Sequence, residues 1–336
     1  MSNINVLAID LAKNVFQLHG PDDKGNPVLK KRLTRDKLVE FIANLNACTI
    51  VMEACGGANN WARKFQTFGH EAKLISPQFV KPFVKTNKND RNDAEAICEA
   101  ASRPTMRFVT PKTIEQQDVQ SLHRIRSRHV QERTAIANQM RGLLLEFGIA
   151  IPKGITKIRS LITEIIEDAN NELSVRARRY IHDLYEELLL KDKHIENYDH
   201  ELKIILKESK ACQRIEKIEG VGVMTATAIV ACIGENAAGF ESGLHLAAFF
   251  GLVPKQNSSG NKDKLLGISK RGDTHIRCLL IHGARAAIIA SAKRSKWIQD
   301  LKERRGANRA AVALANKNAR IIWALLSKET EYNKAS

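Results

Sequence analysis

Four acidic residues in the first hundred positions could bind a divalent metal. Asp90 and Asp93 lie three residues apart within Lys85–Ile97, a stretch rich in basic and amide side chains, and this spacing would place both carboxylates on one face of a helix. Paired carboxylates repel each other unless a cation lies between them, so a divalent metal is a natural partner. Taken alone, the motif favours a polar, capped helix start over a metal site. Asp10 and Glu53, each at the end of a strand-like run, favour the metal site.

Apolar runs and turn residues indicate the elements that would hold these acids. The expected order is a three-stranded antiparallel meander, a helix, a strand, a helix, a strand and a helix. The corresponding residues are 6–9, 15–18 and 28–33 for the meander, then 34–44, 49–52, 61–68, 72–75 and a helix opening at Pro77. This βββαβαβα order places Asp10 inside the first strand and Glu53 at the tip of the fourth.

Three short sequences carry a resemblance to a known family. Ile9–Lys13, Met52–Gly57 and Lys88–Ala94 resemble the DEDD-type transposases of a bacterial insertion-sequence family, relatives of the pilin-gene DNA invertase. The resemblance runs nearly end to end. It implies a RuvC-like, ribonuclease-H-like fold in which a pair of Mg²⁺ ions is held by four acids and phosphodiesters are cut. The matching acids are Asp10, Glu53, Asp90 and Asp93.

A basic, glycine-containing region near the C-terminus offers a second candidate site. Phe249–Pro254 leads into Lys255–Gly260, and Gly267–His275 forms another basic loop. A hydroxyl in such a loop is a candidate phosphate contact and less often a nucleophile. The cations around it, which could bind phosphate, are Lys255, Lys262, Lys270, Arg271 and Arg277.

The order of these motifs also resembles the C-terminal domain of the same transposases. Phe-Gly-Leu-x-Pro is followed by Ser-Gly and then by Ser-Lys-x-Gly. The resemblance implies that Ser259 attacks DNA and forms a covalent phosphoserine link. Ser258 is the adjacent alternative.

The overall charge points to a nucleic-acid partner. The 336 residues carry a formal net charge of +16, with 43% hydrophobic and 27% charged residues, which favours a folded protein that binds a polyanion. From Lys255 onward there are 18 Lys and Arg against 6 Asp and Glu. No long apolar run or secretory pattern is present, and the six scattered cysteines are expected to be reduced. A bacterial cytoplasmic, nucleoid-associated protein is therefore expected, without a membrane partner.

Two helical patterns occupy the middle of the chain. Residues 118–147 predict a long helix whose basic stripe, Arg124, Arg126 and Arg128, either follows a phosphate backbone or is a charged exterior with partners elsewhere. Residues 181–205 carry a heptad repeat. This second helix could pair with the first in the same chain or with another protomer, and a coiled-coil spacer used in oligomerisation is the favoured interpretation.

A helix-hairpin-helix pattern follows the coiled coil. Residues 215–222 contain Gly220 and Gly222 and precede an apolar helix over 223–233. Glycines at a helix start allow backbone N–H groups to approach a phosphate. DNA-backbone binding is favoured over the alternative, a tight turn between two packed helices.

Together these patterns predict an α/β plus α protein with three parts. They are a RuvC-like catalytic domain (1–110), a long basic helix with a coiled-coil oligomerisation arm (111–210), and a mainly helical transposase domain (211–336). The predicted function is an insertion-sequence transposase that acts as a homo-oligomer, dimer or tetramer, on donor and target DNA. The family resemblance also implies guidance by a bridge RNA. The alternatives are a RuvC-like endonuclease that uses water and a non-catalytic nucleic-acid-binding protein.

Overall fold

The protein divides into two compact units, Met1–Ile114 and Glu115–Ser336. The computed structural model describes residues 4–22, 24–84, 90–237, 239–260, 264–291 and 296–332, without the side chains of residues 90, 91 and 291. No helix in these described ranges is long and apolar enough to cross a membrane.

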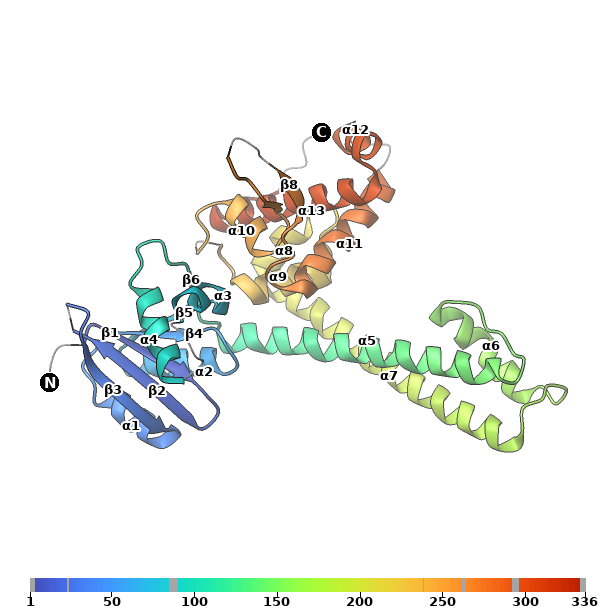
Figure 1. Cartoon of the computed structure of the whole chain (residues 1–336). Coiled ribbons are helices and arrows are strands. Elements are labelled where there is room, and N and C mark those ends of the chain that lie inside the picture. Colours follow the sequence, from blue (N-terminus) through green and yellow to red (C-terminus); the bar gives the residue numbers. More distant parts are fainter. Residues whose placement is uncertain are drawn as a thin grey trace. The chain divides into compact units, whose positions relative to one another are not determined.

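The first unit is built on a six-stranded mixed sheet with strand order β3-β2-β1-β4-β5-β6 (Figure 1). β1 pairs antiparallel with β2 and parallel with β4, so the predicted meander and the predicted βββαβαβα order are both confirmed. The two-residue strand β6 was not predicted, since it is too short to leave a pattern. The strands are β1 (Val6–Leu11), β2 (Val15–Pro21), β3 (Pro27–Thr34), β4 (Thr49–Glu53), β5 (Glu71–Ile75) and β6 (Phe108–Val109).

Helices cover both faces of this sheet because its central strands are apolar on both sides. Leu7 and Ile9 belong to the core under α1 and α2, whereas Ala8, between them, packs with residues of α4. This alternation follows from the two-residue period of a strand. The helices are α1 (Arg35–Ala43), α2 (Ala58–Thr67), α3 (Pro77–Val80), the 3-10 helix η1 (Lys81–Phe83) and α4 (Asp90–Ala101).

The second unit is mostly helical, with one two-stranded hairpin. Its larger core gathers residues from α8 to α13, and a smaller core lies where α5, α6 and α7 meet. The helices are α5 (Ile114–Leu145), α6 (Ile155–Glu167), α7 (Val175–Glu208), α8 (Lys210–Glu216), α9 (Val223–Ile233), α10 (Gly243–Phe249), α11 (Thr274–Ser291), α12 (Lys296–Arg305) and α13 (Ala307–Ser327). The hairpin strands are β7 (Pro254–Gln256) and β8 (Leu265–Ile268).

The predicted heptad seam is used within the chain. In α7 the residues Ile181, Leu188, Ile195 and Leu202, each seven apart, are all buried. Ion pairs from Arg126 to Asp199 and from Arg133 to Asp192 join α5 and α7 and show that the two helices run antiparallel. The intrachain pairing, one of the two alternatives left by the sequence, is therefore present. An oligomeric role of this arm stays a prediction.

Asp192 is the electrostatic centre of the arm. Only 9% of the residue is exposed, and its carboxylate accepts hydrogen bonds from Arg133 of α5 at 3.0 Å and from Arg159 of α6 at 2.6 and 2.9 Å. One α7 side chain thus ties both neighbouring helices to its own. Removal of this carboxylate would leave two guanidinium groups facing each other without their shared acceptor.

Asp192→Ala is therefore expected to destabilise the arm by about 1–3 kcal/mol, a range reduced from fully buried pairs because both guanidinium groups reach solvent. Urea unfolding followed by helical circular dichroism would measure the change. Asp183→Ala is the matched control, because Asp183 is exposed on the same helix. Equal unfolding midpoints for the two variants would contradict the role given to Asp192.

Candidate active site

Asp10 and Glu53 lie side by side at the ends of two parallel strands. Ile9 of β1 is in register with Met52 of β4. Asp10 and Glu53 are the residues that directly follow this pair, so their backbones are expected about one strand spacing, or about 4.8 Å, apart. Both side chains are half-buried. Each follows by two positions a residue, Ala8 or Val51, that packs under α4, so both carboxylates are on the α4 face of the sheet.

The electrostatics at Cys55 support this convergence. Burial raises the pKa of the Cys55 thiol, and the charges of Glu53 and Asp10 raise it further. Both carboxylates are therefore close enough to the same sulfur atom to disfavour a thiolate there. Two negative groups held this close favour a cation between them.

Helix α4 brings the third described acid to the same face. It packs against β1, β2 and β4, and Asp93, Ile97 and Ala100 follow one another at helical spacing. Ile97 and Ala100 are fully buried against the sheet, which places half-buried Asp93 on the sheet-facing side of the first turns. Asp90 begins α4, but its side chain is outside the described part of the structure.

The chemistry of these acids suits a hard divalent cation. Mg²⁺ prefers carboxylate oxygens, usually one or two of them together with water and substrate phosphate oxygens, and Asp10 with Glu53 supplies such a pair. Among the side chains that the structure describes, which exclude that of Asp90, no group of three His, Cys, Asp or Glu is close enough to hold a metal by itself. A phosphate of the substrate would supply further oxygen ligands.

The second candidate site is built on two interlocked loops. The backbone N–H of Lys270 donates to the carbonyl of Gly251 at 3.1 Å, and that of Ser269 donates to Val253 at 2.8 Å. Gly272 has a φ of +77°, and a Cβ there would lie 1.9 Å from the carbonyl oxygen of Phe249. The Phe-Gly-Leu-x-Pro and Ser-Lys-x-Gly motifs therefore form one clasp, with glycine required by both conformation and space.

Gly272→Ala is expected to break this clasp. The positive φ and the collision with a backbone oxygen should together destabilise the C-terminal unit by more than about 2 kcal/mol. Gly267→Ala is the control, because a Cβ on Gly267 of the neighbouring strand β8 meets no atom within 4 Å. Thermal unfolding and limited proteolysis of both variants would test the prediction, and equal protease resistance would contradict it.

Arg277, in the first turns of α11, holds the clasp through hydrogen bonds to its backbone carbonyls. It is 7% exposed, and its guanidinium donates to the carbonyls of Arg271 at 3.0 Å and Phe250 at 3.4 Å and to the Thr274 hydroxyl at 3.0 Å. Arg277 was predicted to bind phosphate, but in this structure it holds the loop, so a phosphate contact would require those bonds to open. Asp273 caps α11 by accepting from the N–H groups of His275 and Ile276.

The clasp supports the hairpin that carries the candidate serine. β7 and β8 pair antiparallel, and the N–H of Asn257 donates to the carbonyl of Lys264 at 3.0 Å. Ser258 and Ser259 follow, both exposed, and Gly260 has a φ of +60°. Lys255, Lys270 and Arg271 are exposed on the same region, as is Lys264, which was not predicted. Lys262 is outside the described residues.

Comparison with known proteins decides the family. A model described as the transposase IS116/IS110/IS902 family matches residues 212–300, and a transposase model for the DEDD domain of IS110 elements matches residues 7–149. The chain is 50% identical over 336 residues to the transposase for insertion sequence element IS1111A of Coxiella burnetii, covering 99% of this chain and 92% of the relative. The chain is a transposase of the IS110 family.

Two other relatives agree over the full length. A probable family 20 transposase of Pseudomonas aeruginosa is 46% identical, covering 98% of this chain and 99% of the relative. The transposase for insertion sequence element IS1328 of Yersinia enterocolitica is 43% identical, covering 99% of this chain and 100% of the relative. The predicted family is confirmed, and so is the prediction of a DNA transposition enzyme. Its DEDD domain implies the use of a divalent metal.

The helix-hairpin-helix of the transposase uses its two glycines differently. A Cβ on Gly220, whose φ is +86°, would lie 2.7 Å from the carbonyl oxygen of Gly283 in α11. Gly220 therefore permits a close helix contact, as in the tight-turn alternative. Gly222 is the N-cap of α9, and a Cβ there meets no atom within 4 Å. Gly222 is thus the position that leaves room for a phosphate.

The basic stripe of α5 is partly neutralised in the transposase. Arg126 is paired with Asp199, and Arg128 lies 2.6 Å from Glu132, whereas Arg124 is exposed. Burial, and then the charge of His275, lowers the pKa of nearby His123 to about 4, so this histidine adds no positive charge at neutral pH. Two of the three arginines in this stripe, Arg126 and Arg128, are therefore paired with acidic residues of α7 and α5.

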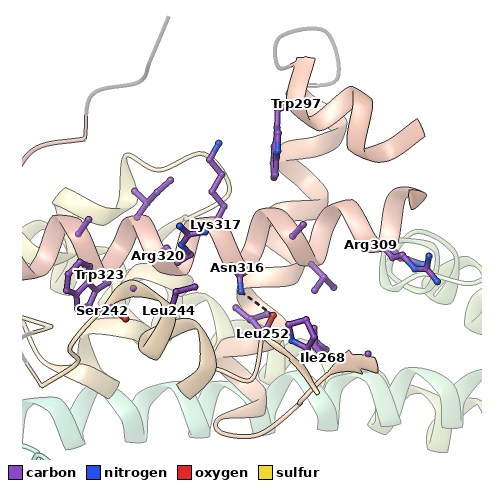
Figure 2. A pocket seen from close by; sticks show the side chains of 18 of the residues that line it. Ser242, Leu244, Leu252, Ile268, Trp297, Arg309, Asn316, Lys317, Arg320 and Trp323 are labelled. Atoms are coloured by element: carbon purple, nitrogen blue, oxygen red, sulfur yellow. Dashed lines mark hydrogen bonds between the residues drawn. The ribbon is translucent and has the colours of Figure 1, made fainter. Parts of the chain in front are cut away.

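A groove of about 1260 Å³ beside the hairpin was missed from sequence (Figure 2). Its basic wall comes from α13, where Arg309, Lys317 and Arg320 line the side opposite the buried residues. The Lys317 ammonium lies 4.6 Å from the ring centroid of Trp297, and Asn316 donates to Leu252 at 3.3 Å. The cations recur along the sequence at spacings of eight and three, which is a helical signal.

Proposed function

We propose that this transposase cuts and rejoins DNA with Ser259 as the nucleophile and with Asp10, Glu53, Asp90 and Asp93 as ligands of a pair of Mg²⁺ ions. The observation that carries the proposal is the position of Ser259. Ser259 is an exposed residue at the end of a hairpin whose base is fixed by two clasped motifs. A rigid base with an accessible hydroxyl at its end suits a nucleophile that has to approach a strand of DNA.

The exchange proceeds through two matched transesterifications. The Ser259 Oγ loses its proton and forms a bond to phosphorus while the bond from phosphorus to a sugar oxygen breaks, and that oxygen leaves as a hydroxyl after taking up a proton. A hydroxyl of the new strand then attacks the phosphoserine, and Ser259 leaves with a proton restored. Each step forms one phosphoester bond as it breaks another, so the strands can be rejoined without ATP.

The acids serve the phosphate that reacts. Bound Mg²⁺ would stabilise the charge that develops on the phosphoryl oxygens and favour the attacking or leaving oxygen. Strand register fixes the backbone positions of Asp10 and Glu53, so these two residues would set where the Mg²⁺ is held. Asp93 of α4 would be a further ligand. The acids belong to the first unit and Ser259 to the second, so this chemistry requires the two to meet. As the family resemblance implies, we propose that they meet between protomers, so that the oligomer is the active form.

Recognition of donor and target DNA is proposed to depend on a bridge RNA. Base pairing to a guide would supply sequence specificity, and the protein would contact backbones. The formal charge of +16 and the cations Arg309, Lys317 and Arg320 along α13 suit this division of labour. In this scheme residues 1–110 form the catalytic domain, 111–210 the oligomerisation arm and 211–336 the serine-bearing domain.

Peptide mapping of a trapped complex tests the proposal. The transposase is purified together with its RNA and is then mixed with labelled DNA and Mg²⁺. Sequencing of the copurified RNA would show whether the loops of the RNA match the donor and target DNA. A denaturing gel should reveal a covalent protein–DNA adduct, and mass spectrometry of its digest should locate a nucleotide on the peptide that contains Ser259. Cleaved DNA without any adduct would instead support a nuclease that uses water.

A further inference from the structure

Strand register aligns one basic side chain with the catalytic acids. Asp10 of β1 pairs with Gln17 of β2, and Gln17 pairs with Arg32 of β3. Residues paired in register across neighbouring strands have side chains on the same face. Asp10, Gln17 and Arg32 therefore form one row on the α4 face, and the backbones of Asp10 and Arg32 are two strand spacings, or about 10 Å, apart.

This row opens into a small pocket at the edge of the sheet. The pocket has a volume of about 320 Å³, and its lining includes Gln17, His19, Lys30, Arg32 and Ala94 of α4. Lys30 pairs with His19 in the next row on the same face. The pocket thus joins the basic end of β3 to the helix that carries Asp93.

The charges around the pocket favour an anion. Lys30 and Arg32 are exposed, and the carboxylate of Glu95 in α4 lies 3.9 Å from the Lys30 ammonium. An ion pair at this distance and exposure is weak, so Glu95 neutralises the charge of Lys30 only in part. Arg32 presents a planar fork of donors, which matches the geometry of phosphate oxygens.

We propose that this pocket receives a backbone phosphate of the DNA strand being cut or joined, close along the strand to the reacting phosphate. Arg32 is its main contact and Lys30 the second, so both are positioning residues. The inference rests on the proposed function of Asp10 and Glu53, because the position of these two acids determines where the DNA strand would cross the sheet. A strand held at two points cannot slide or rotate freely, and such fixation accelerates the reaction of the phosphate at the acids.

The competing explanation is that the charges only protect an edge strand. β3 ends the sheet, and exposed lysine or arginine on an edge prevents pairing with other chains. Lys31 separates the two explanations. It lies between Lys30 and Arg32 and also borders the pocket, but its ammonium is 4.6 Å from the ring centroid of Phe41 in α1, and Phe41 packs with the core on the opposite face.

The experiment compares Arg32→Gln with Lys31→Gln in the RNA-loaded transposase. Both variants remove one charge from the same strand. Arg32→Gln should raise the KM for DNA about tenfold and reduce the slope of log affinity against log salt by about 0.9. Lys31→Gln should leave both close to wild type. Equal effects of the two substitutions would support edge protection and overturn the proposal.

A set of DNA substrates, each with one neutral methylphosphonate, locates the contact. With the wild-type protein, neutralising one phosphate near the reacting position should weaken binding about tenfold. With Arg32→Gln the same substitution should have no further effect, because the contact is already lost. Undiminished sensitivity at every position in the variant would overturn the proposal. Arg32→Lys, which keeps the charge and loses the fork, should give an intermediate loss and remains informative if the glutamine variant folds poorly.

Asp10→Asn distinguishes failure of this inference from failure of the proposed function. If Asp10→Asn is inactive while Arg32→Gln behaves as wild type, the acids are catalytic and the pocket does not hold phosphate. If Asp10→Asn remains fully active, the proposed site itself is wrong.

Discussion

Ser259→Ala is expected to abolish the covalent protein–DNA adduct and to lower the strand-transfer rate by at least about a thousandfold. Removal of an enzyme's nucleophile usually has an effect of this order or larger, because the remaining groups cannot form the intermediate. The fold should be preserved, since Ser259 is exposed at the end of the hairpin. Adduct on a denaturing gel and joined product on a sequencing gel would measure the two losses.

Ser258→Ala is the matched control for this prediction. Ser258 is the neighbouring exposed hydroxyl and is the alternative nucleophile, so its replacement should leave adduct formation within a fewfold of wild type. The reverse outcome, with Ser258 essential and Ser259 dispensable, would move the nucleophile by one residue. Loss of neither activity would exclude both serines and favour attack by water.

Asp10→Asn is expected to abolish Mg²⁺-dependent strand cleavage, again by at least about a thousandfold. The substitution keeps the shape of the side chain and removes its charge, so the pair with Glu53 no longer offers two anionic ligands to a hard cation. Glu53→Gln should behave in the same way. Cleavage rates across a Mg²⁺ titration, together with calorimetric Mg²⁺ binding, would separate lost metal affinity from lost chemistry.

Glu40→Gln provides the corresponding control in the same unit. Glu40 is exposed on α1, and α1 covers the face of the sheet opposite α4. It should bind Mg²⁺ and cleave DNA as the wild type does. Normal cleavage by Asp10→Asn, with an intact fold, would refute the assignment of this acid as a ligand.

The sequence predicted the parts of this protein that depend on local patterns. Alternating apolar residues and turn signals placed Asp10 within the first strand and Glu53 at the tip of the fourth, and the structure has both there. The glycine motifs around Ser259 were recognised as well. Their physical purpose was not, because the need for glycine at Gly251 and Gly272 comes from backbone atoms about twenty residues away.

The roles of individual cations could be decided only by the tertiary structure. Arg126 and Arg277 were grouped with phosphate-binding residues, yet one is paired with Asp199 and the other is buried against loop carbonyls. Arg32 was not considered, although register aligns it with Asp10. An arginine has the same charge wherever it stands in the sequence. Whether that charge is neutralised, buried or offered to DNA depends on the groups that long-range packing places opposite it, and residue spacing does not specify them.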